Sequence, residues 1–182
     1  MALLTLDEAK AQLNIRTTAS DVELQMYIEA LTSAIEGYVG VVEEREITET
    51  VSGQGAAVVL LQTPVMSVTS LTPVQTGGTA VDVARLHVDG PSGVVAYADR
   101  AQFSCGPWTA VYTAGRPVVP PTIKLAALLL LQHLWRTKNG PARGASSADD
   151  YAVTEPVPGF GYAVPNRVLE LLEPFKLPPG IG

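Results

Sequence analysis

The sequence predicts an α+β protein with a helical bundle core, formed by N-terminal and C-terminal helices, and an antiparallel β-rich insertion between them. Three observations predict this fold. Apolar residues recur at helical spacing in the first 40 residues. Short β-branched stretches separated by turn residues fill residues 41–116. A long apolar helical pattern then follows the prolines at 117–121.

Capping residues and periodicity predict two helices at the N-terminus. Thr5 and Glu8 can form a capping box at the start of a helix over residues 6–13. Ser20 and Glu23 can form a second box, which opens a longer helix that ends at Gly40. The second helix is amphipathic, and its apolar positions are Leu24, Tyr27, Ile28, Leu31, Ile35 and Tyr38.

Six short strands are expected in the middle of the chain, with turn residues between them. They are Arg45–Val51, Val58–Leu61, Val65–Leu71, Val81–Leu86, Val94–Tyr97 and Thr109–Thr113. Charged and apolar residues alternate in the first of them, so one of its faces should lie in solvent. The strands should form a small antiparallel sheet or a sandwich.

A third long helix is predicted over residues 123–138. It is apolar around almost its whole circumference at Leu125–Leu131, so it should be buried on several sides. Residues 139–164 show no periodicity and predict a long loop. A short helix from Pro165 to about Pro174 and an extended tail at 175–182 complete the chain.

These elements predict one domain of 182 residues, which is large enough to bury its own core. Residues 1–40 and 117–176 should form its helical core, and residues 41–116 the insertion. No signal peptide is visible, and the apolar run at 123–135 is shorter than the roughly 20 residues that span a bilayer. A soluble, cytoplasmic protein with no membrane partner is therefore expected.

The residue inventory argues against an enzyme. The single cysteine, Cys105, excludes an intramolecular disulfide, and neither His87 nor His133 has an acidic or cysteine neighbour at metal-ligand spacing. The sequence holds no phosphate-binding glycine loop and no hydrolase nucleophile elbow. We therefore expect no catalytic residues, no cofactor and no metal, and we favour a binding or structural protein.

Charge is distributed unevenly along the chain, which has a net charge of −6. Residues 1–50 carry ten acidic and three basic side chains. Residues 51–148 carry three acidic and seven basic side chains, and residues 149–182 carry five acidic and two basic side chains. The absence of a Lys/Arg cluster argues against strong DNA binding. Alternation places Glu43 on the opposite strand face from Glu44 and Glu46, and with Glu49 these residues predict a solvated or partner-facing acidic surface rather than a metal site.

Six stretches, taken together, carry a resemblance. They are LTLDEAKAQLNI at 4–15, DVELQMYIEA at 21–30, AIEGYVG at 34–40, VYTAGR at 111–116, PPTIKLAALLLLQHLW at 120–135 and GYAVPNRVLELLEP at 161–174. In this order they resemble the head-to-tail adaptor (connector) proteins of tailed bacteriophages with long non-contractile tails, and the last is typical of the actinobacterial-phage type. Each stretch encodes packing rather than chemistry.

The resemblance implies a virion structural protein of the neck, assembled in the host cytoplasm. Such adaptors form a ring of copies of themselves, usually twelve, beneath the portal protein. The ring extends the DNA channel, through which double-stranded DNA passes without sequence-specific binding, and it offers a platform to the stopper (head-completion) protein. The sequence leaves open the copy number, the free oligomeric state and the residues that line the lumen.

The resemblance also implies roles for two sets of residues. Aromatic side chains in the long loop and the proline-rich tail become candidate contacts with the portal or a neighbouring copy: Tyr151, Phe160, Tyr162, Phe175, Leu177, Pro178, Pro179 and Ile181. The acidic set, Glu43, Glu44, Glu46 and Glu49, becomes a candidate lumen or inter-subunit face. Packing of the loop on its own subunit stays open. So do another phage neck or tail-completion protein and a small ligand-binding α+β domain.

Overall fold

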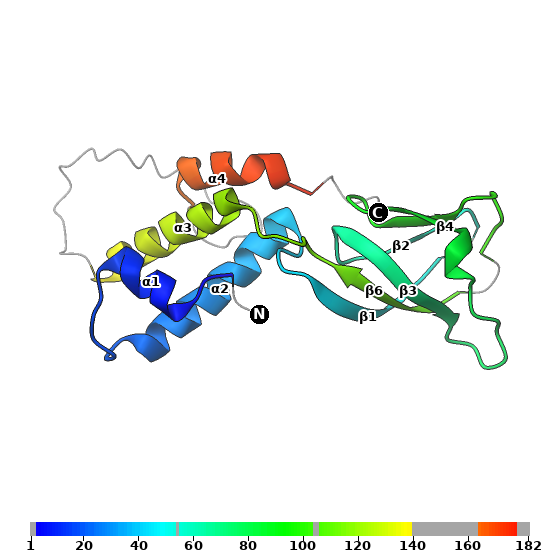
Figure 1. Ribbon diagram of the computed structural model, residues 1–182, viewed down its shortest axis with the longest axis horizontal. Helices are drawn as coiled ribbons and strands as arrows, with labels where there is room; N and C mark the ends of the chain where they lie inside the picture. The colour runs from blue at the N-terminus through cyan, green and yellow to red at the C-terminus, as the bar shows by residue number, and fades with distance from the viewer. Residues whose placement is uncertain (1–2, 54, 104–105, 140–163, 178–182) are drawn as a thin grey trace. The chain divides into compact units, whose positions relative to one another are not determined.

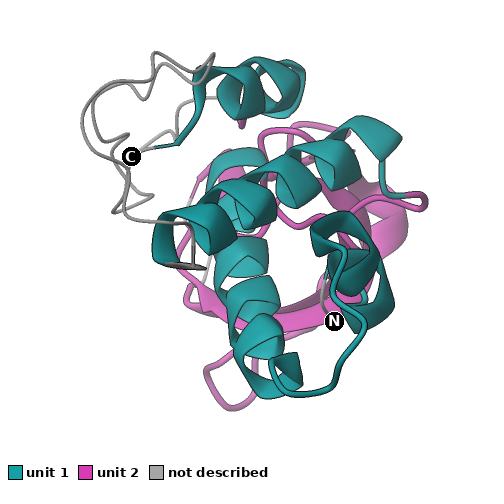
Figure 2. Ribbon diagram, turned by 90° about the vertical axis from the view of Figure 1, so that its left-hand side faces the viewer, with its two compact units in different colours: residues 1–39, 119–176 teal, residues 40–118, 177–182 magenta. Residues whose placement is uncertain are grey.

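The computed structural model describes residues 3–53, 55–103, 106–139 and 164–177 (Figure 1). In these residues the chain forms four α-helices and two three-stranded antiparallel sheets. The predicted α+β class is therefore confirmed. The chain divides into two compact units, which Figure 2 colours separately: residues 1–39 and 119–176 form the helical unit, and residues 40–118 with 177–182 form the β unit.

The helical unit takes its elements from both ends of the chain. They are α1 (Leu6–Leu13), α2 (Asp21–Val39), α3 (Pro121–Asn139) and α4 (Asn166–Leu172), and a short 3₁₀ turn, η2 (Glu173–Phe175), follows α4. Helix α3 packs against α1, α2 and α4, and α1 also packs against α2. The helix that follows the β region in sequence is thus the one that all the other helices of the unit contact.

Helix α1 begins and ends where its sequence predicts. The Thr5 hydroxyl accepts a hydrogen bond from the Glu8 amide at 3.2 Å, and the Thr5 amide donates to the Glu8 carboxylate at 2.9 Å. This is the predicted capping box, and it satisfies amides that the first turn leaves unpaired. Asn14 ends the helix in the left-handed conformation, with φ 56°.

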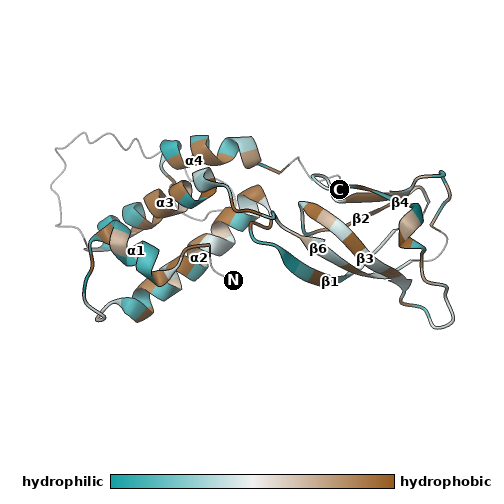
Figure 3. Ribbon diagram, in the orientation of Figure 1, coloured by the Kyte–Doolittle hydropathy of each residue, from teal (hydrophilic) through white to brown (hydrophobic). Residues whose placement is uncertain are grey.

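Helices α2 and α3 are antiparallel, since the start of α2 meets the end of α3 through a Glu23–Lys138 ion pair and a Tyr27–Trp135 ring contact with centroids 6.0 Å apart. Glu23 thus pairs with Lys138 rather than completing the capping box predicted with Ser20. Each helix turns an apolar side inward (Figure 3). The buried residues of these sides are Leu24, Ile28, Leu31 and Ile35 from α2, and Ile123, Ala126, Ala127, Leu130 and Leu131 from α3.

One side of α3 is less buried than its sequence predicts. Leu125 is 46% exposed, and Leu128 and Leu129 are half-buried. The expectation of an apolar helix buried around its circumference is wrong for this side, because the neighbouring helices cover only the opposite part of α3.

The β unit contains two sheets. One has the order β1 (Arg45–Val51), β6 (Trp108–Ala114), β3 (Val65–Pro73), and the other has the order β2 (Ala57–Val59), β5 (Val94–Tyr97), β4 (Leu86–Asp89). The central strand β6 pairs with β1 in unbroken register, whereas its pairing with β3 is interrupted by two register shifts. The six strands lie close to their predicted positions, with one exception.

The exception is the strand predicted over Val81–Leu86. Residues 83–85 instead form a 3₁₀ turn, η1 (Val83–Arg85), and β4 begins only at Leu86. The Asp82 carboxylate accepts a hydrogen bond from the Ala84 amide at 3.1 Å, so this side chain caps the turn. Local capping by Asp82 therefore outweighs the β-branched character of Val81 and Val83.

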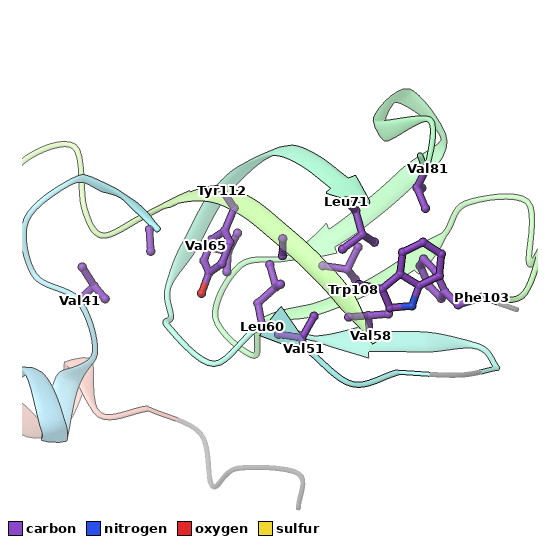
Figure 4. Packing of buried hydrophobic residues seen from close by; sticks show 13 residues of the cluster. Val41, Val51, Val58, Leu60, Val65, Leu71, Val81, Phe103, Trp108 and Tyr112 are labelled. Carbon is purple, nitrogen blue, oxygen red and sulfur yellow. The ribbon is translucent and has the colours of Figure 1, made fainter. Parts of the chain in front are cut away.

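Side chains from both sheets form one hydrophobic cluster (Figure 4). Strand β6 alternates strictly, and Trp108, Ala110, Tyr112 and Ala114 are its buried positions. Val58 of β2 and Val95 of β5 join the cluster from the second sheet, and the Phe103 ring meets Trp108 edge-on with centroids 5.8 Å apart. Of the two predicted arrangements, a single sheet or a sandwich, the structure therefore has two sheets that share a core.

Gly115 lies where the chain leaves β6 and passes close to the backbone that precedes β1. Its φ is 116°, and a Cβ placed on it would lie 2.4 Å from the carbonyl oxygen of Glu43. The Gly115 amide donates to the Pro64 carbonyl at 2.9 Å, so the backbone is also held from the other side. Only glycine fits this close approach.

We predict that Gly115→Ala lowers the free energy of unfolding by about 3 kcal/mol or more, because the backbone strain of 1–3 kcal/mol adds to the overlap with Glu43. Gly77→Ala is the matched control, since Gly77 also has a positive φ, 89°, but has nothing within 4 Å of its added Cβ. The control should lose only about 1 kcal/mol. Urea unfolding of both variants checks this, and equal losses would contradict it.

Candidate interaction surfaces

The four residues of the acidic set do not lie on one surface. Glu44 and Glu46 are exposed, whereas Glu43 and Glu49 are half-buried. Alternation thus separates Glu43 from Glu44 and Glu46 as the sequence predicts. One carboxylate oxygen of Glu43, Oε2, is buried and has no hydrogen-bond partner. The exposed part of the set is therefore the pair Glu44 and Glu46.

Glu49 has an internal partner that the sequence did not reveal. Its Oε1 accepts hydrogen bonds from the Tyr112 hydroxyl at 2.9 Å and from the Leu61 amide at 2.8 Å. The Tyr112 hydroxyl in turn accepts from the Gln62 amide at 3.0 Å. This group ties β1 and β6 to the turn before β3. The alternation of side chains along the two strands could have indicated this contact. It places Glu49 on the same face of β1 as the buried Val51, and Tyr112 on the same face of β6 as the buried Trp108.

The environment of Tyr112 favours the protonated phenol. Burial raises the pKa of the Tyr112 hydroxyl, and the hydrogen bond to the Glu49 carboxylate raises it further, whereas the Gln62 amide acts in the opposite direction. Ionised tyrosine would place a second negative charge beside Glu49 with little water to screen either. The neutral phenol is therefore a structural donor at ordinary pH.

The opposite face of the β1-β6-β3 sheet, which points away from the core, is covered with hydroxyl groups. Its rows across the three strands are Glu46–Thr113–Ser67, Thr48–Val111–Ser70 and Thr50–Thr109–Thr72. Strands β3 and β6 contain no charged residue, so the carboxylate of Glu46 is the one charge in these rows. Such a face offers hydroxyls and a carboxylate but no cation that could neutralise phosphates.

Three acidic side chains of the first 50 residues have cationic partners within the helical unit. Lys124 pairs with Glu8 at 2.8 Å, Lys10 pairs with Asp21 at 2.7 Å, and Lys138 pairs with Glu23. The hydrogen bond from Lys124 and the capping bond to Thr5 hold the pKa of Glu8 below its usual value. Part of the charge contrast between the N-terminal and middle segments is therefore neutralised inside one chain.

Two of the candidate contacts with the portal or a neighbouring copy lie at the C-terminal end of the described chain. Phe175 and Leu177 are both half-buried. Beside them, the Tyr38 hydroxyl donates to the Glu173 carboxylate, and the Lys176 ammonium lies 5.4 Å from the centre of the Tyr38 ring. The Tyr38 side chain of α2 thus contacts Glu173 and Lys176 at the end of the helical unit. The other candidates lie outside the described residues: Tyr151, Phe160, Tyr162, Pro178, Pro179 and Ile181.

The described residues hold no candidate metal site and no candidate membrane-spanning helix. They contain no group of three or more His, Cys, Asp or Glu side chains arranged to hold a metal ion. None of their helices combines the length and the apolar character needed to cross a bilayer.

The chain matches one family model, described as head completion protein, over residues 2–175. No curated protein matches it. Among solved structures, a chain from the neck of an empty gene transfer agent (GTA) particle, computed with C6 symmetry, is 21% identical with a TM-score of 0.65, covering 99% of this chain and 92% of that one.

Two further solved structures share the fold. A chain in the virion of a native GTA particle is 22% identical with a TM-score of 0.63, covering 99% of this chain and 92% of that one. A chain from the neck of a native GTA particle, computed with C12 symmetry, is 21% identical with a TM-score of 0.60, and the match covers 89% of this chain and 86% of that one. At these identities the likeness is one of fold.

The Tyr112–Glu49 bond predicts a specific pH dependence. The unfolded phenol ionises near pH 10, and the folded one at higher pH, so the folded state binds more protons above pH 10 and stability must fall as pH rises. Tyr112→Phe should remove this part of the fall. At neutral pH it should cost about 1–2 kcal/mol, because Glu49 and the Gln62 amide lose a partner.

Urea unfolding between pH 7 and pH 11 measures both effects. Tyr27→Phe, a change at a half-buried tyrosine that packs on Trp135, is the control and should keep the wild-type profile. Identical profiles for wild type and Tyr112→Phe would show that the phenol does not stabilise the fold in this way.

Proposed function

The chain belongs to the head completion protein family, and we propose from this that it is a structural component of the neck that joins the head of a tailed phage or phage-like particle to its tail. The observation that carries the proposal is the family match over residues 2–175, together with a fold shared with chains of GTA particle necks. The resemblance of six sequence stretches to phage adaptors supports the same position.

Within the neck, the chain forms a ring, of twelve copies, beneath the portal. The ring extends the DNA channel and presents a platform to the next neck protein, the stopper, which is a different chain. Support for a ring comes from the C6 and C12 symmetry with which the necks holding chains of this fold were computed. A ring of identical chains closes when one patch of each copy meets a different patch of the next.

The channel role requires surfaces past which DNA can move without binding. The exposed carboxylates of Glu44 and Glu46 remain our candidates for the lumen or inter-subunit face, next to the hydroxyl-covered sheet face that has no Lys or Arg in its three rows. Carboxylates repel phosphates, and hydroxyls alone release no counterions, so neither would hold a moving duplex. Glu49 is better explained by its bond to Tyr112.

We predict that mixing the purified chain with its portal gives a complex with one ring of twelve chains, because the portal supplies the template. Mass measurement by light scattering or native mass spectrometry, with and without the portal, gives the stoichiometry. Six copies would favour another neck component over an adaptor. A complex of one copy, or none, would contradict the proposal, as would particles without this chain that keep their DNA and acquire normal tails.

The tail is our proposed portal contact, along with the aromatic loop residues. A deletion of 178–182 tests it better than one from residue 175, because Lys176 and Glu173 contact Tyr38 within the helical unit. The deletion should lower co-purification with the portal at least about tenfold, the effect of losing roughly 1.4 kcal/mol of binding free energy. A chain with residues 178–182 replaced by an equally long Gly/Ser segment is the control for length. Undiminished binding of the deleted chain would remove the tail from the contact.

A further inference from the structure

The outer side of α2 carries no charge along its central line. Val22, Met26, Ala30, Ser33 and Gly37 recur three or four residues apart, which places them on the side opposite the buried residues of the helix. All five are exposed, Val22 to 81% and Met26 to 67%. Outer sides of helices usually carry charged residues. We call these five residues the α2 outer ridge.

Packing against the described residues does not explain Gly37. A Cβ placed on it would meet nothing within 4 Å, so alanine would fit there. Glycine inside a helix also lowers helix stability relative to alanine. A neighbouring chain that approaches α2 closely at this position would account for the missing side chain.

A second unpartnered side lies on α3. Leu125, Leu129 and Arg136 are separated by four and seven residues, so they share one side of the helix, which we call the α3 outer ridge. Leu125 is 46% exposed, Leu129 is half-buried and Arg136 is exposed. Among the described residues Arg136 makes no ion pair. This ridge is apolar with a cation at one end.

The two ridges are complementary in charge. Glu29 borders the α2 outer ridge and is exposed, and its carboxylate accepts a hydrogen bond from the Gln25 side chain. Its exposed carboxylate could pair with Arg136 of another copy. Two copies joined through the same ridge, α2 on α2, would instead bring Glu29 close to its own counterpart, which like-charge repulsion disfavours.

The spacing along the helices agrees for the central part of the two ridges, although with Arg136 opposite Glu29 the Met26 side chain lies level with the end of α3 and Leu125 lies level with Gly40, just past α2. Helices α2 and α3 run antiparallel within a subunit, and the rotation of about 30° between neighbours in a twelve-membered ring keeps α3 of one copy nearly antiparallel to α2 of the next. With Arg136 opposite Glu29, Leu129 lies about 10.5 Å along α3 and Gly37 about 12 Å along α2. Leu129 would then cover the gap left by Ser33 and Gly37.

We propose that copies of this chain join head to tail, with the α2 outer ridge of one copy packed against the α3 outer ridge of the next. The inference rests on the proposed function, because it names the contact that closes the proposed ring. Two different patches on the same helical unit make a heterologous interface, which generates a ring when the rotation closes.

Complementary charge reversals test the pairing. Glu29→Arg gives a copy with two basic ridges, and Arg136→Glu gives a copy with two acidic ridges. Each variant alone should lower the yield of rings on the portal by about tenfold or more, because every contact then joins like charges. An equal mixture should restore the wild-type yield, because copies that alternate around an even-numbered ring present opposite charges at every contact.

The apolar part of the contact has its own test. Gly37→Ala should raise the thermal midpoint of the free chain, since alanine favours the helix, yet lower the ring yield. Met26→Lys should also lower the yield. Met66→Lys is the matched control, because Met66 is a 41% exposed methionine of the β unit, outside both ridges.

The outcomes separate the two proposals. Wild type that forms no ring on the portal would overturn the proposed ring, and this contact with it. If wild type forms rings, then normal assembly of either charge variant alone, or failure of their mixture, would overturn only the contact between the ridges. A Gly37→Ala chain that gains stability and keeps its ring yield would also count against it. Circular dichroism and thermal melting of each variant exclude unfolding as the cause of a lost ring.

Discussion

The helical unit depends on the burial of one side of α3 by the other three helices. Ile123, Ala126, Ala127, Leu130 and Leu131 supply that side, and they draw residues from the first 39 positions and from beyond 164 to the same core. Exposed ion pairs such as Lys124–Glu8 contribute little stability by themselves. Their part is to fix how the helices align, as do Gln12 with Gln132 and Glu23 with Lys138.

That alignment has a consequence for the surface. Lys124 and Lys138, two cations of the middle segment, pair with N-terminal acids inside the chain. The helical unit also leaves two ridges of apolar or small residues exposed, one bordered by Glu29 and the other ended by Arg136. In the contact that we propose between copies, recognition rests on the shape of the two ridges and on one charge pair, Glu29 with Arg136.

The β unit has a different organisation. Its core contains two large side chains of β6, Trp108 and Tyr112. The buried hydroxyl of Tyr112 donates a hydrogen bond to Glu49 and accepts one from the Gln62 amide. Because this carboxylate faces inward, the outward sheet face is left with hydroxyls and Glu46. The paired rows of this sheet face contain no Lys or Arg that could neutralise phosphates.

The sequence by itself determined the elements whose signals are local. The Thr5–Glu8 capping box sets the start of α1, alternation sets β1 and β6, and proline sets the start of α3, since each depends on neighbours within a few residues. Tertiary structure alone decided which partners meet. Glu23 leaves its predicted capping box for Lys138, 115 residues away in the chain. Glu49 leaves the predicted acidic surface for Tyr112, 63 residues away. Leu125 stays half in solvent because no helix covers it. The physical reason is that burial and charge pairing depend on distances in space, and spacing along the chain does not encode those distances.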